Sequence, residues 1–153
     1  MILLPIIYSF FTGAALAFFV TSATSLFLSS FERDMLPLSF IAAGILVWLS
    51  GLLFSRYQKR IKFTRVLSGS ILFLLISVLL LLSFYISTAS IIAIFLIYAW
   101  IRVFAYIHAI TFWGLSGRLF SLRQGKRVFG LITGGEVFAS ILSFLSVPLL
   151  LKI

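Results

Sequence analysis

Residues 56–85 read RYQKRIKFTRVLSGSILFLLISVLLLLSFY, and this stretch decides the fold. Five of its first ten residues are basic, and none of the next twenty is charged. About 20 mainly apolar residues form a helix long enough to cross the roughly 30 Å hydrocarbon core of a bilayer. A transmembrane strand is about half as long and alternates apolar with polar residues, a pattern that Ile71 to Leu82 does not show. The stretch therefore predicts a membrane-spanning helix preceded by a basic connection.

Four further segments have the same length and apolar character. We predict helices at about residues 3–27, 36–54, 66–85, 91–115 and 128–151. Pro5 and Pro37 lie near the starts of the first two, where a missing backbone N–H costs little. The first run lacks a basic n-region and is too long for a typical signal peptide, so we interpret it as a retained span. The expected fold class is all-α: a polytopic membrane protein with a single transmembrane domain over residues 1–153 and five transmembrane helices.

The composition excludes an ordinary soluble domain. The chain has 153 residues, of which 63% are hydrophobic and 10% charged, whereas soluble domains are about half apolar and a quarter charged. The net charge of +9 is typical of nucleic-acid binding as well, but the basic clusters border apolar spans, where lipid topology explains them. We therefore expect the lipid bilayer, and no nucleic acid, as a partner. Cysteine is absent from the sequence, which excludes a disulfide framework and a thiol-based metal site.

The charges also predict an orientation. A second basic cluster contains Arg118, Arg123, Lys126 and Arg127. Glu32 and Asp34 flank an opposite connection, and the one near Ser87–Ser90 is uncharged. Because basic connections stay in the cytoplasm, we expect a multi-pass protein of the plasma or bacterial inner membrane with a cytoplasmic N-terminus. Five spans leave the C-terminus outside, and we interpret the chain as a fragment whose partners are further helices of the same protein or a second subunit.

Arg102 is the first candidate site residue. It lies near the middle of the fourth span, where a cation costs about 2.5–3.5 kcal/mol on insertion scales. Tyr98, Tyr106, Ala109 and Trp113 share its helical face at spacings of three to four residues. Such a stripe suits the lining of a polar cavity. The alternative is an arginine that pairs with a carboxylate or a backbone carbonyl and locks two helices together.

Glu136 is the second candidate and the only carboxylate inside a predicted span. It lies about 13 Å from the cytoplasmic end of its helix, and Arg102 lies about 19 Å from the same end of the fourth helix, at about 1.5 Å per residue. We therefore predict that the two residues are coupled, either in a substrate-binding or proton-linked site or as an internal salt bridge. His108 lies on a different face from Arg102, which favours a packed imidazole over a ligand.

Small residues mark the beginning of the fifth span. Gly130, Gly134, Gly135 and Ala139 form a row in which transmembrane backbones approach closely. Helix packing is the favoured interpretation, and a gating hinge is the alternative. The first span is also rich in small and hydroxyl residues, namely Thr12, Gly13, Thr21, Ser22, Thr24 and Ser25. Those hydroxyls either bond helix carbonyls or line a solute path.

The sequence carries no enzyme signal. It has neither a Ser/His/Asp arrangement nor paired carboxylates inside a span, and His108 has no second histidine or cysteine with which to bind a metal. We therefore expect no catalytic residues, no metal and no cofactor.

Residues 51–60 read GLLFSRYQKR, which resembles the cytoplasmic loop between the second and third helices of the major facilitator superfamily. The matching positions are Gly51, Arg56, Lys59 and Arg60. Ser55 stands where the family has aspartate, and Gln58 where it has glycine. Arg102 also resembles an intramembrane arginine of proton-linked members. The resemblance implies that Gly51, Arg56, Lys59 and Arg60 lie near a cytoplasmic gate.

A narrower likeness covers about twenty residues. Phe112-Trp113-Gly114, followed by GKRVFGL at residues 125–131, is similar to the fourth-to-fifth-helix region of the nucleotide (ATP/ADP) exchanger branch and its bacterial relatives. Family members have about twelve helices in two halves, with the substrate site between them. The resemblance implies that this chain is an incomplete N-terminal six-helix half.

Two functions follow as expectations. The first is the N-terminal part of a secondary active transporter that moves a small-molecule solute by alternating access. The sequence does not identify the solute. Arg102, Glu136, Tyr98, Tyr106 and Trp113 would then lie on the substrate or coupling path. The alternative is a non-transporting anchor, assembly or sensor module with a transporter-like fold, which the departures at Ser55 and Gln58 favour.

Overall fold

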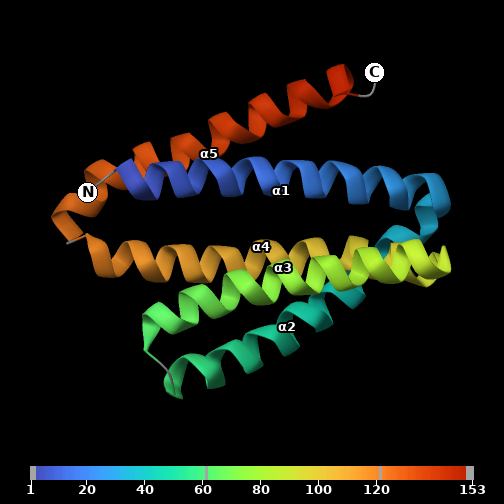
Figure 1. Cartoon of the computed structure of the whole chain (residues 1–153), viewed down its shortest axis with the longest axis horizontal. Helices are drawn as coiled ribbons and strands as arrows, with labels where there is room; N and C mark the ends of the chain where they lie inside the picture. Colours follow the sequence, from blue (N-terminus) through green and yellow to red (C-terminus); the bar gives the residue numbers. More distant parts are fainter. Residues whose placement is uncertain (1–2, 61, 121, 151–153) are drawn as a thin grey trace. The chain divides into compact units, whose positions relative to one another are not determined.

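The chain folds into helices connected by short turns (Figure 1). The computed structural model describes residues 3–60, 62–120 and 122–150. Its elements are α1 (Leu3–Ser30), the short 3-10 helix η1 (Arg33–Met35), α2 (Leu36–Arg60), α3 (Phe63–Thr88), α4 (Ile91–Leu119) and α5 (Leu122–Leu150). Within these ranges there is no strand, and five helices are long and apolar enough to cross a membrane. The predicted all-α polytopic membrane fold is therefore confirmed.

The helices continue beyond the apolar runs that predicted them. α2 ends at Arg60 rather than near residue 54, so Gly51, Arg56 and Lys59 lie on its last three turns and not in a loop. Leu, Gln, Lys and Arg are good helix formers, and cations near a helix C-terminus interact favourably with its dipole. Similarly, α5 begins at Leu122, before the predicted start at residue 128. Its predicted end at residue 151 lies outside the described residues.

The uncharged connection between α3 and α4 is a tight turn. Ala89 adopts the left-handed conformation with φ 46°, and its N–H donates to the Tyr85 carbonyl at 2.8 Å. The Ser90 hydroxyl accepts the Ile92 N–H at 3.2 Å, which caps the start of α4. These bonds satisfy backbone groups that the two helix ends leave unpaired.

The described chain forms two compact units. The first, the α1–α5 unit, contains the chain up to Ser22 and from Gly114, and thus most of α1 and all described residues of α5. The second, the α2–α4 unit, runs from Ala23 to Trp113 and contains η1, α2, α3 and most of α4.

The core of the α2–α4 unit lies where α3 and α4 meet α2. Leu74, Val103 and Ile107 are buried there, and the half-buried residues around them are Leu46, Val47, Phe54, Trp100, Phe104 and Tyr106. Two hydrogen bonds connect α3 with α4: Trp100 Nε1 donates to Ser77 Oγ at 2.9 Å, and Thr111 Oγ1 lies 3.3 Å from Ser70 Oγ. Their residue order shows that α3 and α4 are antiparallel.

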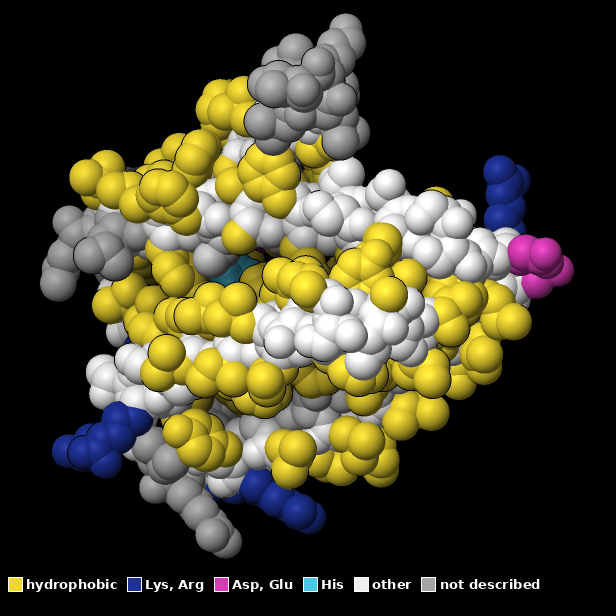
Figure 2. Space-filling model, turned by 45° about the vertical axis from the view of Figure 1, so that its right-hand side comes forward, with side chains coloured by type: hydrophobic (Ala, Val, Ile, Leu, Met, Phe, Trp, Pro, Cys, Tyr) yellow, Lys and Arg dark blue, Asp and Glu magenta, His cyan; other side chains and the backbone are white. Residues whose placement is uncertain are grey.

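Large apolar side chains cover the outer faces of α2 and α3. The most exposed include Ile41, Trp48, Leu53, Leu72, Leu80 and Ile86. Figure 2 shows hydrophobic side chains over much of the face turned to the viewer, with the visible acidic side chains at its right-hand edge. Contiguous apolar surface of this extent is unfavourable in water, so these faces are suited to contact lipid.

Candidate functional site

Arg102 lies in the middle of α4 with its side chain outside the packed core. It follows Ile91, the first residue of α4, by 11 residues, or about 17 Å along the axis. Its neighbours Ile101 and Val103 are buried, whereas Arg102 is exposed. Its Cζ lies 5.4 Å from the centroid of the Phe40 ring of α2, within the range of a cation–π contact. A mid-span cation in this position requires a polar partner or water beside it.

Two of the three aromatic residues predicted to share the Arg102 face pack against neighbouring helices. Tyr98 stacks on the buried Phe27 at the end of α1, with 4.2 Å between ring centroids. Tyr106 is half-buried among the residues around the core of the α2–α4 unit. Trp113 is exposed and meets Phe112 edge to face at 5.4 Å. Tyr98 and Tyr106 thus connect α4 with α1 and α2.

The structure brings together two residues that the sequence assigned to different sites. A Cβ atom on Gly51 would lie 2.8 Å from the Tyr106 hydroxyl oxygen. Real Cβ contacts are essentially never shorter than 3.0 Å, so the tyrosine reaches this position only because residue 51 is glycine. Gly51 was expected near a cytoplasmic gate, and in the structure it packs against the hydroxyl end of Tyr106 of α4.

We expect Gly51→Ala to destabilise the protein, because overpacking a helix interface costs about 1–3 kcal/mol. The effect should fall near the lower limit, since the hydroxyl end of Tyr106 can move. Adding Tyr106→Phe removes the clashing oxygen and should restore the unfolding midpoint in detergent. Gly44→Ala is the matched control, since Gly44 lies on the same helix with open space around its Cβ position. Equal midpoints for the two alanine variants would contradict the contact.

Glu136 lies in the α1–α5 unit, where α5 packs against Gly13 of α1. A Cβ atom on Gly13 would lie 2.5 Å from the Glu136 carbonyl oxygen and 3.0 Å from its Cγ. The Ser140 hydroxyl donates to the carbonyls of Glu136 at 2.9 Å and Gly13 at 3.3 Å. One turn earlier, the Ser9 hydroxyl donates to the Ile132 carbonyl at 2.7 Å. The two helices therefore run parallel in close backbone contact, side by side in Figure 1.

Sequence reasoning missed this contact. Gly13 was assigned to a polar stretch, although Ser9 and Gly13 form a small-xxx-small pair of the kind that packs transmembrane helices. Thr12 and Thr21, from the same stretch, donate to carbonyls of the preceding turn, those of Tyr8 and Ala17, both at 2.8 Å.

The predicted packing row of α5 has two different faces. Ala139 is buried, and Gly135 lies near Ile6, whose Cγ2 would be 3.5 Å from a Cβ on the glycine. Gly130 and Gly134 are exposed, with open space at their Cβ positions. Packing through these two glycines stays a prediction.

Arg102 and Glu136 belong to different compact units, and their coupling stays a prediction. His108 is buried in α4 and stacks on Phe112 with 5.8 Å between ring centroids. Among the residues that the structure describes, no group of three or more His, Cys, Asp or Glu side chains is placed to hold a metal ion.

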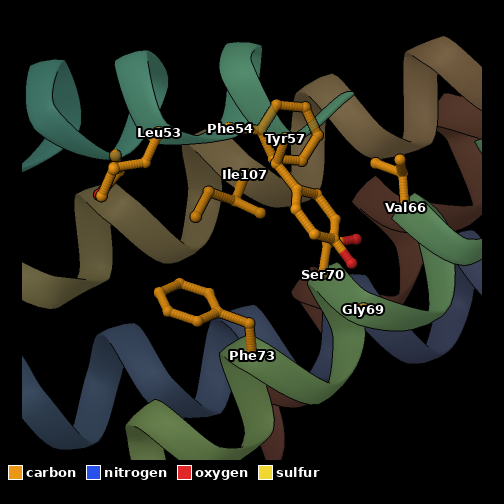
Figure 3. Close-up of a pocket in the computed structure, with 9 residues that line it drawn as sticks. Leu53, Phe54, Tyr57, Val66, Gly69, Ser70, Phe73 and Ile107 are labelled. Atoms are coloured by element: carbon orange, nitrogen blue, oxygen red, sulfur yellow. The ribbon is translucent and has the colours of Figure 1, made fainter. Parts of the chain in front are cut away.

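A pocket of about 460 Å³ opens between α2, α3 and α4, within the α2–α4 unit (Figure 3). Its lining residues are Ser50, Leu53, Phe54 and Tyr57 from α2, Val66, Gly69, Ser70 and Phe73 from α3, and Ile107 from α4. In Figure 3, Tyr57 points from α2 toward Ser70 of α3. The sequence pattern did not predict this pocket, because its residues read as ordinary apolar and hydroxyl positions of separate spans.

Comparison with protein families, with curated protein sequences and with solved structures finds no match to this chain.

Proposed function

We propose that this chain forms the N-terminal part of a secondary active transporter that moves a small solute by alternating access. The exposed position of Arg102 in the middle of α4 is the observation that carries the proposal. A guanidinium at this depth costs several kcal/mol in hydrocarbon, whereas a water-filled path with an anionic or polar solute would stabilise it. The resemblance of residues 51–60 to the major facilitator superfamily supports the same function.

The proposed orientation has a cytoplasmic N-terminus in a plasma or bacterial inner membrane. The parallel packing of α1 and α5 fits five successive spans of alternating direction, and the basic connections select the side on which the N-terminus lies. The exposed cations Arg56, Lys59, Lys62 and Arg65 would then lie at the cytoplasmic surface. In this arrangement Glu136 and Arg102 are central ionisable groups at membrane depth, and rocking of one half of the transporter against the other would expose them alternately.

Cysteine accessibility tests the water-filled path, and the native chain has no cysteine to interfere. Ala109 lies seven residues after Arg102 on the same face of α4. We expect Ala109→Cys in the full-length protein to react with a charged, membrane-impermeant thiol reagent about tenfold faster than Leu80→Cys, because only a thiolate in water is reactive. Leu80 is the matched control, since it lies deep in α3 and is 65% exposed on an apolar face.

Two positions outside the spans serve as references for orientation. Asp34→Cys should react when the reagent is added to intact cells, and Lys62→Cys only after the cells are permeabilised. Labelling of Lys62→Cys from outside would reverse the proposed orientation. Equally slow labelling of Ala109→Cys and Leu80→Cys would contradict the solute path and favour the anchor, assembly or sensor module that the departures at Ser55 and Gln58 also support.

A further inference from the structure

We propose that the pocket between α2, α3 and α4 binds an acyl chain of an anionic phospholipid, whose headgroup lies on the basic cluster between α2 and α3. The cluster consists of Arg56, Lys59, Lys62 and Arg65. The assignment rests on the lining of the pocket, its opening to the apolar surface, and the charges at its end.

The pocket is a groove with regular walls. Ser50, Leu53, Phe54 and Tyr57 follow one another at helical positions i, i+3, i+4 and i+7 of α2, and Val66, Gly69, Ser70 and Phe73 repeat the same spacing on α3. Gly69 keeps the groove open beside Tyr57, since a Cβ there would lie 3.0 Å from the tyrosine oxygen. The groove runs over eight residues of each helix, or about 10 Å from the first to the last, which is roughly one third of the hydrocarbon thickness.

The rim of the groove belongs to the surface suited to lipid. Leu53 is 67% exposed and Phe73 46% exposed, so an acyl chain reaches the pocket sideways from the bilayer without crossing a polar barrier. The polar lining side chains are the three hydroxyls of Ser50, Tyr57 and Ser70, and no lining residue is charged. A water-soluble anion would therefore find no counter-charge inside the pocket, whereas a hydrocarbon chain gains about 0.8 kcal/mol for each CH₂ group that it buries.

The charges at the end of the groove select the headgroup. Tyr57 and Val66 line the pocket, and the described cations of the cluster lie next to them in the sequence. The side chains of Arg56, Lys59, Lys62 and Arg65 are exposed. The sequence contains no carboxylate between Asp34 and Glu136, so neither α2, α3 nor α4 supplies an anion to neutralise them. Each such cation near an anionic lipid surface contributes about 1 kcal/mol of attraction.

Photolabelling of the full chain in phosphatidylcholine vesicles tests the assignment. The probes are phosphatidylglycerol and phosphatidylcholine that carry the same photoreactive acyl chain. We expect phosphatidylglycerol to form several-fold more adducts than phosphatidylcholine on the peptides that contain residues 50–57 and 66–73. Ser50→Phe should fill the deep end of the groove and reduce these adducts several-fold, whereas Ser55→Phe, at an exposed position of the same helix, should leave them unchanged.

The headgroup preference is tested separately with variants that leave the groove intact. Lys62→Gln combined with Arg65→Gln should bring the two probes to equal labelling, whereas Arg33→Gln, in η1, should not. These positions are exposed, so the charge variants decide the question even if Ser50→Phe fails to fold. Equal labelling by both probes in the native chain, or adducts spread evenly over α2 and α3, would overturn the proposal. If soluble glycerol phosphate reduced labelling by the phosphatidylglycerol probe, the cluster would be a site for a free anion, and the proposed lipid site would be overturned.

Discussion

Arg102→Ala should abolish or strongly reduce solute uptake by the full-length protein at normal expression. A hydrogen bond to a charged group contributes about 1.5–3 kcal/mol, so we expect uptake to fall by about one to two orders of magnitude. Arg102→Lys keeps the charge but not the planar donor fork and should retain part of the activity. The measurement is uptake of a panel of labelled small solutes into vesicles that contain the protein.

Arg33→Ala is the matched control, because Arg33 is an exposed arginine of η1 in the connection between α1 and α2. It should transport at the native rate. Unchanged uptake by Arg102→Ala would remove Arg102 from the solute path and leave it as a residue that locks helices together.

The same assay tests the coupling of Arg102 with Glu136. Arg102→Gln and Glu136→Gln each leave the other group without its partner, so the double variant should lose less activity or stability than the sum of the two single losses. Purely additive losses would show that the two residues act independently.

Gly13→Ala should separate α1 from α5 and lower the free energy of unfolding by about 1–3 kcal/mol. The added methyl group would lie 2.5 Å from the backbone carbonyl oxygen of Glu136, and a backbone atom, unlike the end of a side chain, moves only with its helix. The shift would also weaken the bond from the Ser140 hydroxyl to the Gly13 carbonyl. Reversible unfolding of the full chain in mixed detergent micelles measures the change.

Gly130→Ala is the control for this effect, since Gly130 lies in α5 with open space at its Cβ position. Alanine favours the helix over glycine by about 1 kcal/mol, so this variant should be as stable as the native chain or slightly more stable. If Gly13→Ala were as stable as Gly130→Ala, the close approach of α1 and α5 would be refuted.

The five spans follow from the sequence because each depends on its own residues. Every backbone hydrogen bond of a membrane helix is made within the helix, so the uncharged run at residues 66–85 is sufficient to predict α3. The bounds were less accurate. α2 continues to Arg60 because the hydrogen bonding of a helix does not stop where its apolar surface ends.

The contacts between spans depend on residues far apart in the chain. Gly13 and Gly130 are both glycines in apolar helices, and their local sequences do not tell which one meets a neighbour. Only the packing of α1 on α5 distinguishes the tight site at Gly13 from the open one at Gly130. In the same way, the contact of Tyr106 with Gly51 and the pocket beside Tyr57 are each formed by residues of separate helices.

The sequence by itself thus determined the helical fold class, the apolar character of the helices and their number, because hydrophobicity and charge are properties of each segment alone. The depths of Arg102 and Glu136 within their helices changed from the predicted values, because α4 ends at Leu119 and α5 begins at Leu122. The tertiary structure decided which glycines are tight, which aromatic rings pack and where a pocket opens. Those features arise from the distances between helices, and side-chain shape sets these distances only after the helices have met.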